Sequence, residues 1–266
     1  LDRVLEKADV DYIKWDMNRS ICDLYSNSLS AENQGELSYR YVLGLYELLE
    51  RLTSNYPNVL FEGCSGGGGR FDAGILYYCP QIWCSDNTDA YSRTKIQYGT
   101  SFFYPISAMG SHVSCTPNHQ TGRITPLETR GITAMAGSFG YELDLNTLSE
   151  DEKLSVKQQI IKFKQYRSLI HNGNYYRLTN PMSENLAIWS FVNEDKSKVL
   201  VQGMIYQSRS NCVGYTVKLT GLDLNKKYRL NGTERIFTGK ALTYGGIQLP
   251  IENGDYFPIE LYFIEE

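Results

Sequence analysis

The order of predicted strands and helices constrains the fold of this chain more than any other feature. Up to residue 172, short apolar segments typical of buried strands alternate with segments of helical periodicity. Strand followed by helix, repeated, predicts a parallel sheet whose helices cross over between neighbouring strands. The predicted strands cover residues 10–15, 59–61, 82–84, 106–109 and 139–141, and the predicted helices cover about 36–53 and 150–171, with further helices beginning near Asp72 and Ala90.

The pattern changes after residue 172. Short apolar segments then follow one another without helices, and Asn, Asp, Gly and Lys fill the gaps between them. This arrangement predicts an antiparallel β domain, with a β-sandwich as the expected form. Its strands are predicted at 186–191, 199–203, 215–219 and 259–264. We therefore expect two domains, residues 1–172 and residues 173–266.

The length of the first domain limits what the parallel sheet can be. A complete (β/α)₈ barrel needs about 250 residues, so residues 1–172 have room for about five strand–helix units. The first eight residues also have the apolar spacing of the second half of a helix. We expect an α/β fold with a partial TIM-type (β/α)₈ barrel, in the C-terminal part of a larger protein. An open five-stranded, doubly wound sheet is the alternative.

The composition of the chain limits the kinds of molecule that it can be expected to bind. The 266 residues carry a formal net charge of −4 without any Lys/Arg-rich stripe, which argues against nucleic acid and anionic lipid as partners. No run of about 18 apolar residues is present, so no membrane span is expected. Six scattered cysteines, no CxxC motif and three histidines indicate neither a disulfide framework nor a zinc site. We expect a cytoplasmic protein without metal or cofactor.

Three polar side chains lie at the end of the first predicted strand. Because side chains alternate along a strand, Lys14, Asp16 and Asn18 share one face. They place an ammonium, a carboxylate and an amide at one spot. Active-site groups of a parallel barrel come from the carboxyl ends of its strands, so this spot is a candidate active site.

A second carboxylate follows the third predicted strand, where alternation puts Asp86 on one face with Ile82 and Cys84. Two carboxylates at the carboxyl ends of barrel strands fit glycoside hydrolysis. In that reaction one carboxylate attacks the anomeric carbon or activates water, and the other protonates the leaving oxygen. The alternative for any strand-end aspartate is a loop or helix cap, and it is the preferred interpretation for Asp72 and Asp89.

Four consecutive glycines, residues 66–69, follow the second predicted strand. Glycine lets backbone come close to a ligand because it has no Cβ. A dinucleotide-binding loop would need a glycine where Phe71 stands, and no Lys-Ser/Thr pair ends the run as in a Walker loop. We favour backbone amides that face sugar hydroxyls, with a merely flexible loop as the alternative.

Cys64 lies just before the glycine run and has two interpretations. A thiol nucleophile would need a histidine partner, and His112 is the one near a strand end. We favour the alternative, in which Cys64 lines the pocket or is buried. Glu62 is expected to point the same way but deeper, where a salt bridge fits better than catalysis.

These segments together resemble one family, the bacterial α-galactosidases of glycoside hydrolase family 36. The resemblance rests on residues 14–19 (KWDMNR), 64–72 (CSGGGGRFD), 83–90 (WCSDNTDA) and 137–142 (GSFGYE), in this order and at matching separations. It implies a retaining mechanism with Asp16 as nucleophile and Asp86 as acid/base. It also implies that the terminal galactose is bound by Lys14, Asn18, Cys64, Gly66 and Gly67.

The resemblance implies an architecture as well. The family combines an N-terminal β-supersandwich, a (β/α)₈ barrel and a C-terminal β-sandwich, is commonly tetrameric and uses no metal. By that template the chain begins just before the fourth barrel strand. The expected partners are an α-galactoside oligosaccharide of the raffinose or melibiose type and further copies of the chain. The alternatives are a non-catalytic galactoside-binding fragment and a related α-glycosidase or galactosyltransferase.

Overall fold

The computed structural model describes residues 1–19, 21–251 and 253–266. Its contacts divide the chain into two compact units, Leu1–Asp86 and Asn87–Glu266.

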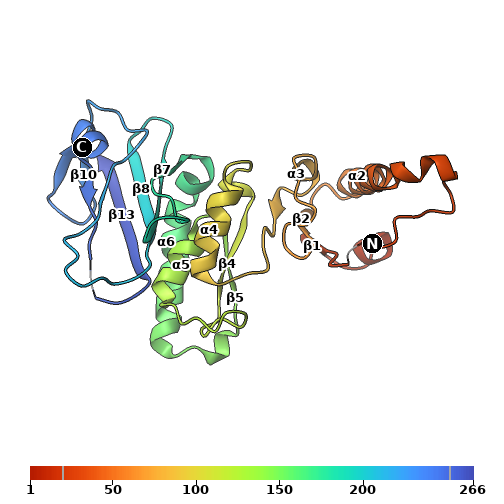
Figure 1. Ribbon diagram of the computed structural model, residues 1–266, viewed down its shortest axis with the longest axis horizontal. Helices are drawn as coiled ribbons and strands as arrows, with labels where there is room; N and C mark the ends of the chain where they lie inside the picture. The colour runs from red at the N-terminus through yellow and green to blue at the C-terminus, as the bar shows by residue number, and fades with distance from the viewer. Residues whose placement is uncertain (20, 252) are drawn as a thin grey trace. The chain divides into compact units, whose positions relative to one another are not determined.

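The first unit is built on a parallel three-stranded sheet in the order β1–β2–β3 (Figure 1). Its strands are β1 (Tyr12–Asp16), β2 (Leu60–Cys64) and β3 (Gln81–Ile82), and its helices are α1 (Asp2–Leu5), the 3₁₀ helix η1 (Ala31–Glu36), α2 (Leu37–Asn55) and α3 (Ile75–Tyr78). The predicted parallel pairing of the first three strands is confirmed.

The two faces of this sheet differ in chemistry. One face packs on α2 and α3 through a small apolar core made of Leu49, Leu52, Phe61, Ile75, Cys79 and Ile82, with Ile13 and Trp15 against it. Since successive side chains alternate, the opposite face carries the polar residues of β1 and β2. In the register of the pair, Lys14 lies opposite Glu62 and Asp16 lies opposite Cys64. The sheet thus separates an apolar, packed face from a polar one.

The second unit begins with helices and one parallel strand pair, β4 with β5. These elements are α4 (Ala90–Thr100), the 3₁₀ helix η2 (Ile106–Ala108), β4 (Gly110–Ser114), α5 (Leu127–Met135), β5 (Ser138–Glu142), the 3₁₀ helix η3 (Leu145–Thr147) and α6 (Glu150–Asn172). Two buried arginines fasten the helices to β4. Arg93 of α4 donates to the carbonyl oxygen of Gly110, and Arg130 of α5 donates to that of Ser114 at 2.6 Å.

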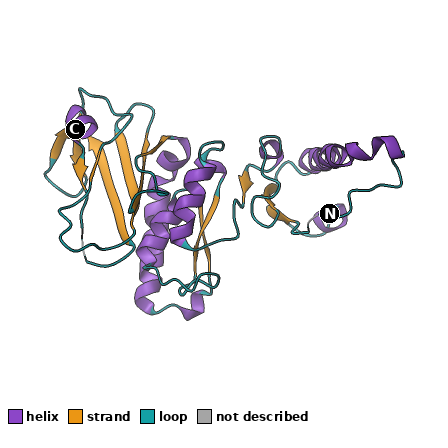
Figure 2. Cartoon of the chain, in the orientation of Figure 1, coloured by secondary structure: helices purple, strands orange, loops and turns teal. Residues whose placement is uncertain are grey.

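The rest of the second unit is antiparallel, as predicted (Figure 2). A six-stranded sheet has the order β11–β10–β13–β8–β7–β6, and β9 pairs with β12 separately. The elements are β6 (Asn174–Arg177), β7 (Leu186–Val192), β8 (Lys198–Ile205), β9 (Thr216–Val217), β10 (Lys227–Leu230), β11 (Ile236–Thr238), the π-helical turn η4 (Ala241–Gly245), β12 (Ile247–Gln248) and β13 (Phe257–Glu265). One apolar core joins the two sheets, as in a sandwich, while α5 contacts β8 and β13. All seven residues of β7, which α6 contacts, are buried.

Two expectations about individual elements need correction. Residues 106–109 were expected to form a strand, but residues 106–108 form η2 and the strand begins at Gly110. Ile106 and Ala108 are buried in either conformation, and a short apolar run does not distinguish a turn of helix from a strand. The helix α5 was not predicted. It is buried over seven of its nine residues, and the polar Thr129, Arg130 and Thr133 are among them, so residue type does not mark its buried side.

Candidate active site

A hydrogen-bonded cluster forms at the carboxyl end of β1. The amide of Asn18 donates to Oδ2 of Asp16 at 3.2 Å, and its Oδ1 accepts the backbone N–H of Gly66 at 2.6 Å. Asn18 therefore links the Asp16 carboxylate to the glycine loop. The structure thus brings together three residues that the sequence predicted for the site.

Lys14 is held by two groups of different kinds. Its Nζ lies 4.0 Å from Oε1 of Glu62 and 4.5 Å from the centroid of the Trp83 ring. The other carboxylate oxygen of Glu62 accepts a hydrogen bond from the Tyr12 hydroxyl. Glu62 is only 3% exposed, and a buried carboxylate needs such partners. The salt bridge expected for Glu62 is confirmed.

Cys64 is buried beside Asp16, 4% exposed. Burial raises the pKa of its thiol to about 11, and the nearby Asp16 raises it further while the Gly67 amide and Lys14 lower it. At neutral pH the sulfur is therefore protonated and is a poor nucleophile. This favours the pocket-lining interpretation over the thiol-nucleophile hypothesis.

The glycine loop packs closely against the chain's own backbone. A Cβ on Gly67, whose φ is +81°, would lie 2.7 Å from Cα of Ser85 and 3.1 Å from the amide nitrogen of Asp86. A Cβ on Gly68 would lie 3.0 Å from the carbonyl oxygen of Cys84. Gly66, at φ +54°, has open space around it instead. Close packing against neighbouring backbone explains why residues 67 and 68 are glycine. The open space beside Gly66 is available to a ligand instead.

Asp86 is exposed and is the last residue of the first unit. The sharing of a face by Ile82, Cys84 and Asp86 stays a prediction. Ile82 packs in the core against the helices, whereas Trp83 faces Lys14. The regular strand β3 ends at Ile82, although the backbone N–H of Trp83 still donates to the carbonyl oxygen of Gly63 at 2.9 Å. The backbone position of Asp86 is set by the close approach of Gly67.

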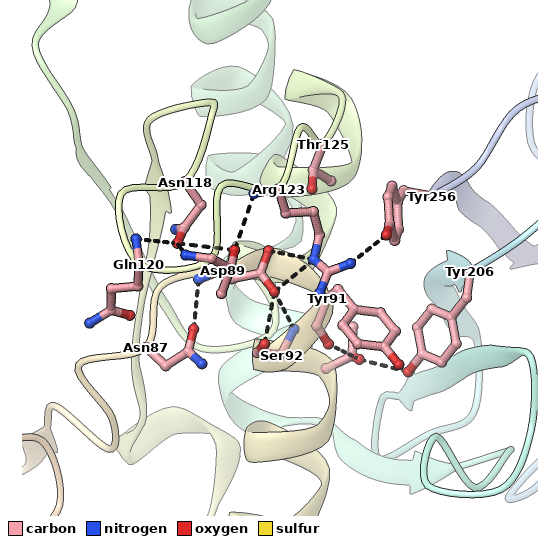
Figure 3. A network of polar contacts seen from close by, with 12 residues as sticks. Asn87, Asp89, Tyr91, Ser92, Asn118, Gln120, Arg123, Thr125, Tyr206 and Tyr256 are labelled. Carbon is pink, nitrogen blue, oxygen red and sulfur yellow. Dashed lines mark hydrogen bonds and ion pairs between the residues drawn. The ribbon is translucent and has the colours of Figure 1, made fainter.

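The two aspartates interpreted as caps behave as expected. Asp89 is the N-cap of α4 and accepts the backbone N–H of Ser92 at 3.1 Å. Asp72 accepts the N–H of Ile75 at 2.8 Å, at the start of α3. Figure 3 shows a further partner of Asp89 that the sequence did not indicate, the guanidinium of Arg123. These residues are 34 positions apart, and no local pattern relates them.

A pocket of about 970 Å³ opens beside the Asp16 cluster, within the first unit. Its polar lining includes Asn18, Arg19, Gly66 and Arg70, and its apolar lining comes mainly from α2 and the segment that precedes it. The volume is at the upper end of the range for ligand pockets. Asn18 and Gly66 thus belong both to the cluster around Asp16 and to an accessible cavity.

Among the described residues, no three His, Cys, Asp or Glu side chains are grouped so that they could hold a metal ion. Within that same part of the chain, no helix combines the length and the apolar character needed to cross a membrane.

Comparison with known proteins places the chain in a family. The melibiase family model matches residues 1–173, and the model of the glycosyl hydrolase family 36 C-terminal domain matches residues 186–261. The chain belongs to glycosyl hydrolase family 36. The sequence resemblance is thereby confirmed.

Curated relatives of this family 36 chain include two bacterial enzymes. The bifunctional alpha-galactosidase/sucrose kinase AgaSK of Mediterraneibacter gnavus is 51% identical over 98% of this chain and 27% of its own length. The alpha-galactosidase AgaA of Geobacillus stearothermophilus is 49% identical over 96% of this chain and 35% of its own length. The chain therefore spans about a third or less of the length of these relatives.

Solved structures of family 36 have the same fold. The α-galactosidase AgaB of Geobacillus stearothermophilus superposes with a TM-score of 0.96 at 48% identity, covering 100% of this chain and 36% of that one. AgaA from the same organism, solved in complex with raffinose, gives 0.96 at 47% identity, covering 99% of this chain and 37% of that one. The fold is a partial TIM-type (β/α)₈ barrel followed by an antiparallel β-sandwich, as predicted.

Proposed function

We propose that the chain carries the catalytic residues of a retaining α-galactosidase that removes terminal galactose from raffinose- or melibiose-type oligosaccharides. The observation that carries the proposal is the cluster at the end of β1, where Asp16, Asn18 and Gly66 are joined by hydrogen bonds. Lys14 and Cys64 lie on the same sheet face. Paired carboxylates are the machinery that glycoside hydrolysis requires, and Asp86 supplies the second one.

In the first step, a carboxylate oxygen of Asp16 attacks the anomeric carbon of the galactoside. A covalent bond forms between them while the bond from that carbon to the leaving oxygen breaks. The protonated carboxyl of Asp86 gives its proton to the leaving oxygen, so the aglycone departs as a neutral alcohol. The products of this step are a β-galactosyl ester on Asp16 and a carboxylate on Asp86.

In the second step, water replaces the ester. The Asp86 carboxylate takes a proton from the water, whose oxygen attacks the anomeric carbon and releases the Asp16 carboxylate. Two inversions at one carbon give galactose with the original α configuration. A separation of about 5–5.5 Å between the two carboxyl groups is expected for this retaining mechanism.

The remaining predicted residues bind the galactose ring. Lys14 offers an ammonium, Asn18 an amide, Cys64 a thiol and the glycine loop its backbone at Gly66 and Gly67, which together suit a ring bearing several hydroxyls. Lys14, close to the buried Glu62 carboxylate and the Trp83 ring, has a defined place beside Asp16. Restricting such donors before substrate arrives reduces the entropy lost on binding.

Structures of the relative AgaA support the substrate class and the choice of the two aspartates. One form, with an Asp-to-Asn substitution, was solved in complex with raffinose, and another, with an Asp-to-Ala substitution, in complex with stachyose. The two substituted aspartates are 70 positions apart in that protein, which is also the separation of Asp16 and Asp86.

Replacing Asp16 by Ala in the full-length protein tests the mechanism. Without a nucleophile, we expect turnover of a nitrophenyl α-galactoside to fall by at least about 10⁴-fold. Azide should then fit the vacated space and attack from the same face, giving galactosyl azide of inverted, β configuration. Chromatography and NMR of the product measure both effects. Activity retained without azide would refute the assignment of Asp16.

A second candidate function follows from the length of the chain, which spans about a third of AgaA. The isolated chain could bind galactosides without hydrolysing them. Calorimetric titration with galactose and a turnover assay on the same sample distinguish the two functions, since binding without turnover supports the second. A substrate panel distinguishes an α-galactosidase from a related α-glycosidase or a galactosyltransferase.

We further propose residues 1–172 and 173–266 as the two domains, a cytoplasmic location, and a homo-oligomer as the working form. Limited proteolysis tests the boundary, fractionation of cells tests the location, and sedimentation of the full-length protein tests the assembly.

A further inference from the structure

Both backbone polar groups of Met17, the residue between Asp16 and Asn18, are hydrogen-bonded to residues 64 and 65 at the end of β2. Its N–H donates to the carbonyl oxygen of Cys64 at 3.3 Å, one position beyond the last pair of the strand register. Its carbonyl oxygen accepts from the hydroxyl of Ser65 at 2.6 Å. The two peptide units that join Met17 to its neighbours are therefore both held.

Arg70, which is half-buried, reaches the carbonyl groups of both strand ends. Its Nη2 donates to the carbonyl oxygen of Cys64 at 2.7 Å, and its Nη1 donates a longer bond, of 3.5 Å, to that of Met17. A guanidinium suits this arrangement, because its N–H groups point from one rigid plane towards separate acceptors and its charge strengthens each bond. Arg70 thus joins the carboxyl ends of β1 and β2 beyond their regular pairing.

The course of the glycine loop brings Arg70 to this place. The backbone N–H of Ser65 donates to the carbonyl oxygen of Gly67 at 2.8 Å, and the N–H of Gly69 donates to the carbonyl oxygen of Ser65 at 3.1 Å. A Cβ on Gly69 would lie 2.5 Å from that same oxygen of Ser65, so this closed turn requires glycine there. The loop therefore returns to the strand end from which it started, and Arg70 follows it directly.

The Asn18 side chain carries the restraint to the Asp16 carboxylate. Its amide donates to Oδ2 of Asp16 at 3.2 Å, while its Oδ1 accepts from the N–H of Gly66 at 2.6 Å. The place of this amide depends on the backbone of Met17, since Asn18 follows it directly. A displacement of the Met17 carbonyl group would therefore move Asn18 and Asp16 relative to each other.

We propose that Ser65 and Arg70 are positioning residues for the Asp16 nucleophile: by binding the carbonyl groups of Met17 and Cys64, they hold Asp16 in place for attack on the anomeric carbon. The inference rests on the proposed role of Asp16, and every residue in it belongs to the first unit. It gives a function to two side chains that neither attack the substrate nor belong to the set proposed to bind galactose.

The physical basis is the narrow range of geometry in which a nucleophile attacks. The reacting atoms must approach to about 3–3.5 Å with their orbitals aligned. A displacement of about 1 Å, caused by a change away from the reacting atoms, can cost about 100-fold in rate. Asp16 is the last residue of β1, so the strand restrains it on one side and the contacts of Met17 restrain it on the other.

The experiment measures how fast Asp16 is labelled in the full-length protein. The probe is an α-galactosyl fluoride that carries a second fluorine on the sugar ring. A carboxylate oxygen of Asp16 forms a bond to the anomeric carbon while the bond from that carbon to fluorine breaks and fluoride leaves as the anion. Because fluoride leaves without a proton, the rate reports on the nucleophile and not on Asp86. The ring fluorine slows the oxocarbenium-like second step, so the ester accumulates.

Mass spectrometry of timed samples gives two quantities, the rate constant of labelling and the final labelled fraction. A positioning residue changes the rate constant, whereas loss of folded protein lowers the final fraction. The variants are Arg70→Met, which removes the guanidinium, and Ser65→Ala, which removes only the hydroxyl that donates to Met17.

Tyr46→Phe is the matched control. The Tyr46 hydroxyl donates to Oδ1 of Asp72 at 2.6 Å, two residues beyond Arg70 in the sequence. The substitution therefore removes one hydrogen bond from the same unit, and this bond does not involve the carbonyl groups of Met17 or Cys64.

We expect Arg70→Met to lower the rate constant of labelling by about 10- to 100-fold, with an unchanged final fraction. Ser65→Ala should lower it by about three- to tenfold, because Arg70 still reaches the Met17 carbonyl group. Tyr46→Phe should leave both quantities as they are in the unmodified protein.

A rate constant that is unchanged in Arg70→Met or in Ser65→Ala overturns the role of that residue. A fall of the same size in Tyr46→Phe overturns the proposal as a whole. A lower final fraction at an unchanged rate constant also overturns it, because only the amount of folded protein has then changed. If circular dichroism shows that Arg70→Met does not fold, Ser65→Ala decides alone.

Asp16→Ala, measured beside these variants, tests the proposed function separately, and no label should form in it. Labelling that is lost in Asp16→Ala but normal in the Arg70 and Ser65 variants overturns only the positioning role. Labelling of Asp16→Ala at the rate of the unmodified protein, or none in the unmodified protein, overturns the assignment of Asp16 and the inference with it.

Discussion

At the scale of the residue, Cys64 shows how burial determines reactivity. Its thiol pKa is raised to about 11, mainly because burial disfavours the charged thiolate. A pKa raised in the folded state stabilises the protein at lower pH. That contribution is present below the ordinary thiol pKa of 9.0 and is lost as the pH rises through about 11.

The first prediction therefore concerns alkylation. At pH 8, Cys64 in the folded protein should react with iodoacetamide about 100-fold more slowly than an ordinary thiol, because the thiolate fraction falls tenfold per pKa unit. Mass spectrometry of timed samples measures the rate, with the exposed Cys115 as an internal reference. Equal rates at the two cysteines would contradict this account of Cys64.

The second prediction concerns Glu62. Glu62→Gln removes the charge that faces Lys14 at 4.0 Å, so Lys14 should become less well placed for galactose. We expect KM for a nitrophenyl α-galactoside to rise about three- to tenfold, a loss of about 1 kcal/mol in binding, while kcat changes little. Steady-state kinetics of the full-length protein measures both constants.

Glu36→Gln is the control for this experiment. Glu36 forms an ion pair of similar kind with Arg40, but on the exposed surface of the segment before α2. Such exposed pairs contribute little, so its kinetics should equal those of the unmodified protein. A lower kcat with unchanged KM in Glu62→Gln would assign Glu62 a different role.

At the scale of the element, two requirements explain the glycines of the loop: a left-handed backbone conformation and close contact with neighbouring backbone. Gly67 combines a left-handed φ of +81° with a close approach to the backbone of residues 85 and 86, whereas Gly66 has only the left-handed φ. A side chain at Gly67 must therefore displace backbone, and backbone does not yield as the end of a flexible side chain would.

The third prediction compares alanine at these two positions. Gly67→Ala should lower the free energy of unfolding by about 2–4 kcal/mol, through strain and collision together. Gly66→Ala should lower it by about 1 kcal/mol, through conformation alone. Urea titration followed by circular dichroism gives both values. A cost for Gly66→Ala equal to or above that for Gly67→Ala would show that the approach to residues 85 and 86 is unimportant.

Element boundaries show where local patterns end. Ser149 and Glu152 form a complete capping box at the start of α6, and Gly173 follows its end, so both limits of this helix were predictable from its own residues. The strand β3 was not predictable in this way. Only two of its residues pair regularly, and the orientation of residues 83–86 depends on what packs against them.

At the scale of the whole molecule, the first unit leaves apolar surface uncovered. Tyr39 and Leu43 of α2 are 68% and 47% exposed, and Tyr12 of β1 is 45% exposed. In the three-stranded sheet β1 also occupies an edge position. Exposed edges and apolar patches favour association with further protein.

The fourth prediction follows from this surface. The isolated chain of 266 residues should self-associate in solution at micromolar concentration. Light scattering coupled to size-exclusion chromatography measures its mass, and an Arg substitution at Leu43 should shift the distribution towards smaller species. A stable monomer over the whole concentration range would contradict the prediction.

The sequence by itself determined the features that depend on near neighbours. The alternation of strands and helices, the change to antiparallel strands after residue 172, and the caps made by Asp72 and Asp89 all follow from periodicity or hydrogen bonds over a few positions. The placing of Lys14, Asp16 and Asn18 on one side of β1 follows in the same way, because alternation on a paired strand is fixed by its backbone.

Only the tertiary structure decided which distant residues meet. Arg123 reaches Asp89 across 34 positions and Tyr256 across 133, and Glu62 meets Tyr12 across 50. The sequence marks each of these side chains as polar but does not specify its partner. The packing of strands and helices decides which side chains meet. Burial then makes such a contact energetically important, because a charge removed from water needs an opposite charge or hydrogen-bond partner within the protein.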